Sequence, residues 1–373
     1  MSLRGWLTEA LLTGVKGVLW WRSQPAAIHR FLRRRNLRRS ANCAALPAPK
    51  VRVALVQTSL SLVPTGEAYA ARMLPLVQEA VERGAQLVVF PEDNATSLVG
   101  LLPGVERLAS SVSLTAGGGA AGEDGGQGSG PAAAGFKVAD VFRLLSSATR
   151  RVFETTFSEL ARAFGVYLVP GSAVLAEPDG RVRNIAYLFG PHGELIGRQP
   201  KVHLLPLEAE WGLSPGDRFS VFATPLGRIA LPVCMDMTYF ESFRILSQLG
   251  AEIVAVPSAN PEPWNLWLVL RGLWPRVQEA EVYGLIASAV GGFLGLEFTG
   301  RSSAFAPMEL TADGTGVVAQ AAGVTTEEIV VADLDLEALR RLRQRSGVRA
   351  GFNRELYRAY FPAIYQKGRA ERR

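Results

Sequence analysis

The chain has 373 residues, of which 48% are hydrophobic and 20% are charged. This length is enough for one large domain or two small ones, and the composition is typical of a globular α/β protein with a large core. Two cysteines, Cys43 and Cys234, and three histidines are present. So few thiols and imidazoles exclude a disulfide scaffold and argue against a zinc site of ordinary ligand spacing, and we expect no metal.

The net charge of +6 is unevenly distributed along the chain. Residues 1–50 contain ten of the 40 basic residues and one of the 34 acidic residues, so this segment carries +9 and the remainder carries −3. Because the remainder is nearly neutral, the composition does not indicate a basic surface for nucleic acid on the folded body. We therefore expect no nucleic-acid partner.

The N-terminal extension, residues 1–50, combines an apolar helical face with a run of arginines between Arg30 and Arg39. Glu9 and Lys16 interrupt the apolar face, so no apolar run reaches the roughly 18 residues that a membrane span requires. An amphipathic helix followed by a basic run is typical of a membrane-surface anchor. A helix that packs on the body or on a second subunit is an equal alternative, and an organellar transit peptide is a third.

The folded domain is predicted to begin with a strand at residues 51–57. A helix over residues 64–83 and a strand over residues 86–90 follow, and this succession predicts a βαβ unit with parallel pairing. Residues 116–135 are rich in Gly and Ala but lack the Gly-Lys-Ser/Thr ending of a phosphate loop. We therefore expect them to form a flexible insert.

The remaining elements are predicted to alternate between helix and strand. Expected helices cover residues 138–164, 239–249, 335–345 and the segment that holds Trp264, Trp267 and Trp274, and expected strands cover residues 166–172, 182–190, 194–199, 252–257, 285–290, 302–306, 316–320 and 328–333. The aromatic residues of the last segment favour a packed C-terminal extension over residues 346–373. The main domain is therefore expected to span residues 51–345.

Three of the expected strands end in a residue that can take part in acyl transfer. Cys234 follows the apolar run 229–233, Glu92 follows the strand at 86–90, and Lys201 follows the strand at 194–199. A helix predicted soon after Cys234 would favour a thiolate and a developing oxyanion at its N-terminus. The three strand ends therefore supply a nucleophile, a base and a cation.

The motifs around these residues are Phe90-Pro91-Glu92, the run from Lys201 to Pro206 (KVHLLP), and Cys234-Met235-Asp236-Met237 with Glu241 behind it. In this order they resemble the Glu-Lys-Cys motifs of the nitrilase (carbon–nitrogen hydrolase) superfamily, nearest to the nitrilase-like amidohydrolase domains found in bacteria. The resemblance implies an α/β fold, a four-layer α-β-β-α sandwich of two mixed sheets, preceded here by the amphipathic helical extension. It also implies a homo-oligomer.

The resemblance further implies hydrolysis of a non-peptide carbon–nitrogen bond through a cysteine thioester, without a cofactor. Cys234 attacks the carbon, Glu92 is the general base, and Lys201 with the Met235 N–H stabilises the oxyanion. The expected partner is a small-molecule amide, or less favourably a nitrile. A free thiol suits a reducing compartment, so we expect a cytoplasmic protein that contacts the inner membrane face through residues 1–40.

Several further residues are candidates for substrate binding. Superfamily members often carry a second glutamate after the lysine, and both Glu208 and Glu210 are candidates here, with a slight preference for Glu210. Met235, Tyr239, Trp264 and Trp267 could line an apolar pocket or belong to ordinary core or oligomer contacts. Asn260, at a strand end, is a weaker candidate for substrate contact.

Two alternatives to a hydrolase remain open. An N-acyltransferase would use the same acyl-enzyme with an amine in place of water. A non-catalytic binding protein with the same fold would keep Cys234 as a buried structural thiol, which the reactivity of that thiol would distinguish.

Overall fold

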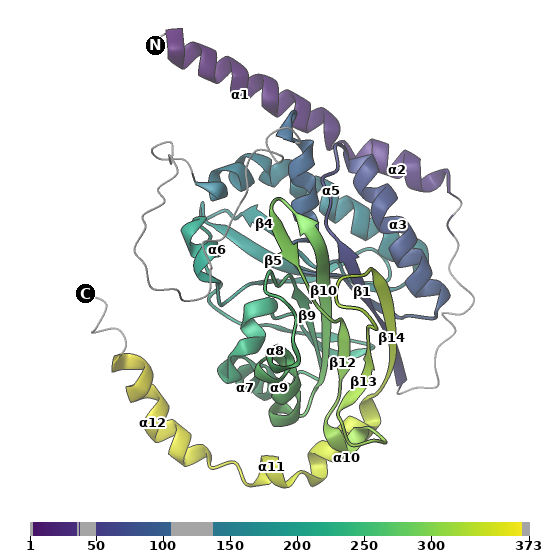
Figure 1. Cartoon of the computed structure of the whole chain (residues 1–373), viewed down its shortest axis with the longest axis vertical. Helices are drawn as coiled ribbons and strands as arrows, with labels where there is room; N and C mark the ends of the chain where they lie inside the picture. The colour runs from purple at the N-terminus through teal and green to yellow at the C-terminus, as the bar shows by residue number, and fades with distance from the viewer. Residues whose placement is uncertain (1–2, 36, 38–49, 106–136, 368–373) are drawn as a thin grey trace.

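The computed structural model describes residues 3–35, 37, 50–105 and 137–367 (Figure 1). The expected flexible insert at 116–135 and Cys43 lie outside the described residues. The described chain forms two β-sheets that meet along one edge, with helices on the outer face of each sheet.

The first sheet is built around β1, the strand with which the domain begins. Strand β2 pairs with β1 in parallel, and β3 pairs in parallel with β2. Strand β14 pairs antiparallel along the other side of β1, and β5 continues antiparallel beyond β3. The strands of this sheet are β1 (Lys50–Ser59), β2 (Leu87–Val89), β3 (Tyr167–Val169), β4 (Ser172–Ala176), β5 (Val182–Phe189), β6 (Leu195–Pro200) and β14 (Glu328–Asp335).

The second sheet is built around β10, and its parallel neighbours β9 and β8 carry the edge strand β7. Its strands are β7 (Val221–Thr224), β8 (Gly227–Ala230), β9 (Ile253–Ser258), β10 (Tyr283–Phe293), β11 (Leu296–Phe298), β12 (Ser303–Phe305) and β13 (Val317–Gln320). The end of β1 pairs in parallel with β10, Thr58 opposite Ala289, and this short contact joins the two sheets.

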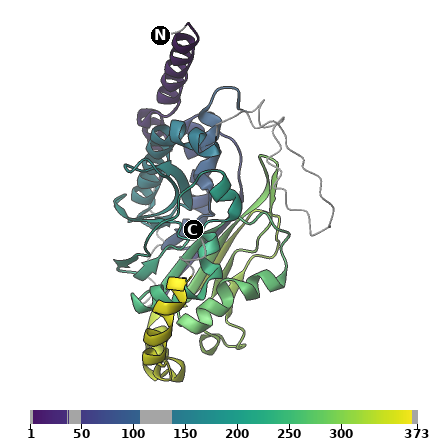
Figure 2. The same cartoon turned by 90° about the vertical axis from the view of Figure 1, so that its left-hand side faces the viewer.

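Helices cover both outer faces, and an apolar layer fills the space between the sheets (Figure 2). Helices α2 (Pro25–Arg33), α3 (Gly66–Glu82) and α5 (Val138–Phe164) pack on the first sheet, and α7 (Phe240–Gln248) and α9 (Leu273–Ala280) pack on the second. Leu55, Val89 and Leu285 lie in the layer between the sheets. The predicted four-layer α-β-β-α sandwich is confirmed.

The long helices of the first sheet follow the apolar spacing of the sequence. In α3, Tyr69, Met73 and Val77 recur every four residues and are buried, and Thr65 caps the helix by accepting a hydrogen bond from the Ala68 N–H at 3.1 Å. Helix α5 ends at Gly165, whose φ of 70° is the left-handed conformation that glycine adopts without strain. These signals explain why both helices match their predicted ranges closely.

The N-terminal extension divides into two helices with different environments. Helix α1 (Leu3–Arg22) projects away from the body (Figure 1), whereas α2 inserts Ile28, Phe31 and Leu32 into the core beside α3 and α5. In the part of the chain that the structure describes, no helix is long and apolar enough to cross a membrane.

Two predicted elements are interrupted by glycine. The strand expected over residues 166–172 is split into β3 and β4, because Gly171 adopts a φ of 82° and a Cβ there would lie 1.8 Å from the Pro91 carbonyl oxygen. The tryptophan-rich helix is split into α8 (Leu266–Arg271) and α9 at Gly272. The first break brings the turn after β3 against the segment that leads to Glu92.

Four further helices complete the described chain, together with short 3-10 turns. They are α6 (Pro206–Glu210), α10 (Leu336–Arg345), α11 (Gly347–Ala350) and α12 (Arg354–Lys367), and the turns are η2 (Asn94–Leu101), η3 (Cys234–Thr238) and η4 (Met308–Leu310). Helix α12 contacts α7 through Phe361 and through Tyr365, whose hydroxyl donates to Glu241 at 2.5 Å. The C-terminal extension therefore packs on the body through one side.

Candidate active site

Cys234 lies at a sharp turn directly after the buried segment that continues β8. Its φ of 40° is a left-handed conformation, which is strained for a residue with a Cβ. Asp236 holds this turn, because its carboxylate accepts hydrogen bonds from the N–H of Val233 at 2.9 Å and of His203 at 2.7 Å. The turn thereby ties the end of β8 in the second sheet to the loop after β6 in the first.

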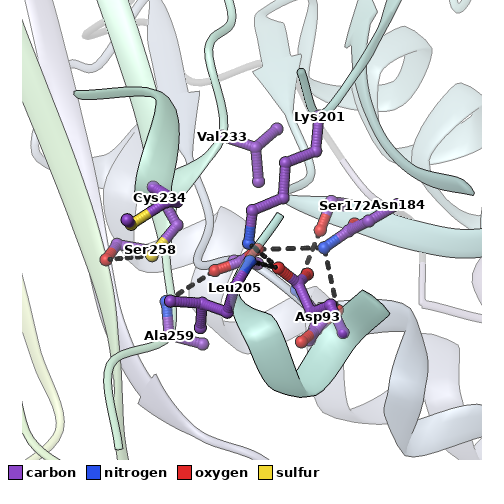
Figure 3. Close-up of polar contacts among 12 residues, drawn as sticks. Asp93, Ser172, Asn184, Lys201, Leu205, Val233, Cys234, Ser258 and Ala259 are labelled. Atoms are coloured by element: carbon purple, nitrogen blue, oxygen red, sulfur yellow. Dashed lines mark hydrogen bonds and ion pairs between the residues drawn. The ribbon is translucent and has the colours of Figure 1, made fainter. Parts of the chain in front are cut away.

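Glu92 and Lys201 form a buried ion pair beside this turn, with Lys201 Nζ 2.8 Å from Glu92 Oε1. Asn184 Nδ2 donates to the same oxygen at 2.9 Å, and the Ala259 N–H donates to Glu92 Oε2 at 3.1 Å. Figure 3 shows Lys201 directed between the Cys234–Ser258 pair and the Asn184–Asp93 pair. The structure therefore brings together all three residues of the predicted set.

Glu208 is the second glutamate that meets the lysine. Its Oε2 lies 2.8 Å from Lys201 Nζ and accepts a hydrogen bond from the Leu205 N–H at 2.8 Å. Glu210 is exposed, so the sequence-based preference for it is corrected. The reason is geometric: residues two positions apart on a helix point in nearly opposite directions, so α6 can turn only one of the two toward the lysine.

The Cys234 thiol is buried and accepts a hydrogen bond from Ser258 Oγ at 3.5 Å. Burial, reinforced by the Glu92 carboxylate, raises the pKa of this thiol well above its usual range. The turn at Cys234 is a short 3-10 segment, and it does not give the low thiol pKa that a helix N-terminus was expected to favour. The protonated thiol is therefore the resting form, and an attack on substrate requires a base.

Glu92 is placed to be that base. Burial raises the pKa of its carboxyl, Glu208 adds to this effect, and the Lys201 ammonium opposes it. The neighbouring Cys234 thiol also lowers the pKa of the Glu92 carboxyl, more weakly. Burial acts to lower the pKa of Lys201, but the neighbouring carboxylates raise it well above its usual value, so the lysine is charged.

Two polar residues at the site were not predicted from the sequence. Asp93, with a φ of 58°, follows Glu92, and its Oδ1 accepts a hydrogen bond from Asn184 Nδ2 at 3.4 Å. Burial raises the pKa of Asp93 well above its usual value, and the nearby Glu92 and Glu208 raise it further. Asp93 directly follows the Phe-Pro-Glu motif, which was a usable signal, whereas Asn184 is a lone polar residue in a strand and gave none.

A cavity of about 110 Å³ opens at Cys234. Met235, Asn260 and Trp264 line it, as proposed from the sequence, together with Arg301. Two other candidates lie elsewhere: the Tyr239 ring stacks on His203 with centroids 4.3 Å apart, and Trp267 is 74% exposed. Neither is among the lining residues, so their assignment to the pocket is corrected.

Among the described residues, no group of three or more His, Cys, Asp or Glu side chains is arranged to hold a metal ion.

The sequence profile of the carbon–nitrogen hydrolase family matches residues 52–344. This chain belongs to that family. A nitrilase from Pyrococcus abyssi is 30% identical over 296 residues, which cover 79% of this chain and 93% of the relative. The omega-amidase NIT2 of Homo sapiens is 32% identical over 214 residues, or 54% of this chain and 72% of the relative. The predicted enzyme class, a carbon–nitrogen hydrolase, is confirmed.

A third relative, the probable hydrolase YhcX of Bacillus subtilis, is 33% identical over 216 residues, which cover 55% of this chain but 41% of the relative. Among solved structures, a variant of the amidase from Nesterenkonia sp. AN1 with a covalent adduct of fluoroacetamide at its active-site cysteine superposes with a TM-score of 0.57 at 22% identity. The match covers 85% of this chain and 99% of that amidase. At this identity the likeness supports the fold alone.

Proposed function

We propose that this carbon–nitrogen hydrolase cleaves amides through a thioester on Cys234, with Glu92 as general base and Lys201 as oxyanion stabiliser. The observation that carries the proposal is the buried contact of Lys201 with two carboxylates, Glu92 and Glu208, beside a strained cysteine. Burying these charges is costly and the strained φ adds to the cost, so their joint presence favours a catalytic role over a structural one.

In the first half-reaction, Cys234 Sγ attacks the amide carbon while its proton moves to Glu92. The new S–C bond converts the carbonyl into an oxyanion, which the Lys201 ammonium and the Met235 N–H stabilise. Collapse of this intermediate breaks the C–N bond. The leaving nitrogen takes the proton held by Glu92, so an amine or ammonia departs and the acyl group stays on sulfur.

In the second half-reaction, water replaces the amine. Glu92 accepts a proton from the water molecule while the water oxygen attacks the thioester carbon. The oxyanion again forms beside the Lys201 ammonium and the Met235 N–H. Collapse breaks the S–C bond and returns the proton from Glu92 to the thiolate, which releases a carboxylic acid. The raised pKa of Glu92 suits a group that accepts and returns a proton in each half-reaction.

Glu208 acts on this cycle through Lys201. A lysine held by one carboxylate could rotate about its flexible side chain, whereas two carboxylates at 2.8 Å on the same nitrogen fix its direction. We assign Glu208 as a positioning residue. Amides are preferred over nitriles as substrates because omega-amidases recur among the relatives, and residues 51–345 form the catalytic domain in this proposal.

The proposal is tested by measuring ammonia release from a panel of small primary amides. Wild-type protein and Cys43→Ala, which changes the other thiol, should be active. Cys234→Ala and Glu92→Gln should be inactive, and intact-mass analysis of wild type should reveal an acyl adduct that is absent from Cys234→Ala. Equal turnover by Cys234→Ala would overturn the thioester mechanism.

We also propose that residues 1–40 contact an anionic membrane surface on the cytoplasmic side. Trp20 and Trp21 at the end of α1 are 59% and 69% exposed, and Arg33, Arg34 and Arg35 follow shortly after. Aromatic side chains beside a basic run match the chemistry of an interfacial anchor. Co-flotation with vesicles containing phosphatidylserine should be lost at high salt and in Trp20→Ser/Trp21→Ser. If the wild-type protein floated no better than the double variant, the anchor would be refuted.

A second copy of the chain is the proposed partner of α12. Its outward side exposes Tyr360 and Ile364, which are 62% and 53% exposed. A row of large apolar side chains on one helix is typical of a subunit contact. Light scattering should give a homo-oligomer for wild type and a smaller species for Tyr360→Glu/Ile364→Glu. A monomeric wild type would exclude the contact.

A further inference from the structure

A second cavity, of about 280 Å³, lies beside the catalytic cluster on the side away from the Cys234 cavity. It is enclosed by η2, the first turns of α5, the segment after α6 and the β10–β11 hairpin. Apart from Asp93, Thr96 and Glu208, its described lining is aliphatic or aromatic. We refer to it as the amine cavity. It is roughly twice the size of an apolar cavity that holds a benzene ring, so it can take a hydrocarbon of about six to eight carbons.

The polar end of the amine cavity is connected to the reacting groups through named contacts. Glu208 lines the cavity and also lies 2.8 Å from Lys201 Nζ. Asn184 Nδ2 bridges Asp93 and the general base, at 3.4 Å from Asp93 Oδ1 and 2.9 Å from Glu92 Oε1. A nitrogen that leaves toward Glu92 therefore departs toward the end of the cavity that carries the carboxyl groups.

The amine cavity and the Cys234 cavity have no described lining residue in common. The cavity at Cys234 adjoins the sulfur to which the acyl group becomes attached. The amine cavity adjoins the carboxyl groups that surround the lysine. Glu208, which contacts Lys201, marks the end of the amine cavity nearest the reacting groups.

The polar groups of the amine cavity select the chemistry of its occupant. Two carboxyl groups at one end repel a carboxylate and attract an ammonium. Thr96 also lines the cavity, and its Oγ1 is buried with no hydrogen-bond partner among the described residues. The apolar walls favour a hydrocarbon attached to that nitrogen.

We propose that the amine cavity binds the amine half of the substrate, and that this enzyme therefore hydrolyses secondary amides in which the nitrogen carries an apolar alkyl or benzyl group. This inference rests on the proposed function. The C–N bond breaks as above, the nitrogen takes the proton held by Glu92, and the product is a primary alkylamine whose hydrocarbon occupies the amine cavity.

The kinetic test compares acetamide with N-butyl-, N-hexyl- and N-benzylacetamide. We expect kcat/KM to rise about fourfold per methylene from butyl to hexyl, as expected for burial of a methylene group. Val141→Phe, which fills the amine cavity from α5, should remove this rise and leave acetamide turnover within about twofold. Val138→Phe serves the same purpose if Val141→Phe does not fold. A series with a longer acyl chain is the control, and neither variant should change its trend.

A binding test separates this inference from the proposed function, because it requires no turnover. Hexylammonium chloride is titrated calorimetrically into Cys234→Ala, and binding is expected, with hexanol binding at least tenfold more weakly. Asp93→Asn should reduce this preference, and Val141→Phe should abolish binding. Failure of hexylammonium to bind, together with no chain-length dependence in an active enzyme, overturns the inference and leaves the proposed function intact. Binding without cleavage of any amide overturns the proposed function and leaves the amine cavity as a ligand site.

Discussion

Buried carboxylates occur in two regions of this enzyme, and the two regions differ in how many cations face each carboxylate. Near α10 and α11, Glu252 meets Arg340 at 2.6 Å and Glu281 meets Arg349 at 2.5 Å, so each carboxylate has its own arginine. In the candidate active site, the carboxylates of Glu92 and Glu208 both contact one ammonium, that of Lys201, and the Asp93 carboxyl lies nearby.

The difference appears in the directions of the pKa shifts. For Glu252, burial would raise the pKa of the carboxyl, but hydrogen bonding to Arg340 and the N–H of Arg228 outweighs it and lowers the pKa. For Glu92, burial wins over its single cation and the pKa is raised. Burial alone therefore does not prepare a carboxylate for proton transfer. The direction of its pKa shift depends on how much positive charge faces it.

Removing the cation should have the largest effect. Lys201→Met leaves buried carboxylates unpaired, so we expect kcat/KM to fall about 10³-fold or more and the protein to lose about 3–5 kcal/mol of stability. Arg340→Met is the matched change in the other region. Because Arg340 is half exposed, we expect a loss of about 0–1 kcal/mol and unchanged kinetics. Urea denaturation and amide hydrolysis measure both, and equal destabilisation by the two variants would contradict the comparison.

Removing one surplus carboxylate should have the next largest effect. Glu208→Gln frees Lys201 to move, so we expect kcat to fall about 10²-fold. It also removes a like charge that raises the pKa of Glu92, so the acid limb of the kcat/KM profile should shift to lower pH. Glu210→Gln is the control on the same helix and should behave as wild type. An unshifted acid limb in an active Glu208→Gln enzyme would show that Glu208 does not influence the base.

A third prediction concerns stability against pH. The folded-state pKa of Asp93 is raised above its usual 3.8, so its contribution to stability decreases as pH rises from that value through the folded pKa. Asp93→Asn removes this loss. Its Tm should therefore exceed that of wild type at neutral pH and equal it well below pH 3.8, where Asp93 is protonated in both states. A Tm difference that is the same at both pH values would assign the effect to packing instead.

The smallest predicted effect concerns Glu252, whose pKa shift is opposite in direction to that of Asp93. The folded-state pKa of Glu252 is lowered from its usual 4.5, so its stabilisation is fully present above that pH and is lost as pH falls through the folded pKa. Glu252→Gln should cost about 1 kcal/mol at neutral pH and progressively less in acid, measured by denaturation between pH 3 and 7. A cost that grows on acidification would be incompatible with a lowered pKa.

The sequence was most informative where a buried strand ends in a polar residue. The apolar runs before Glu92, Lys201 and Cys234 are strong local signals, so the candidate set could be identified before the fold was known. Strands β2, β6 and β8 are not neighbours in one sheet, and the sequence did not show how their ends meet. The layer architecture came from the family resemblance, because alternating helices and strands are compatible with several α/β folds.

Other features depend on geometry that no local pattern carries. The choice of Glu208 over Glu210 depends on where α6 begins and how it is rotated, and helix boundaries are the least predictable part of an element. The breaks at Gly171 and Gly272 interrupt otherwise regular apolar runs, and isolated glycines are tolerated inside many elements. The cavity beside Asp93 is lined from six separate chain segments, so it exists only in the folded protein.

The hydrogen bonds that hold the site run from one sheet to the other. Ala259 after β9 binds Glu92 after β2, and Asp236 after β8 binds His203 after β6. A chain in which each sheet has formed but the two have not docked would therefore lack the Ala259 hydrogen bond to Glu92 and the Asp236 hydrogen bond that fixes the Cys234 turn to the first sheet. During refolding, recovery of activity should follow docking of the two sheets rather than the gain of secondary structure. Activity therefore reports on the last step of folding.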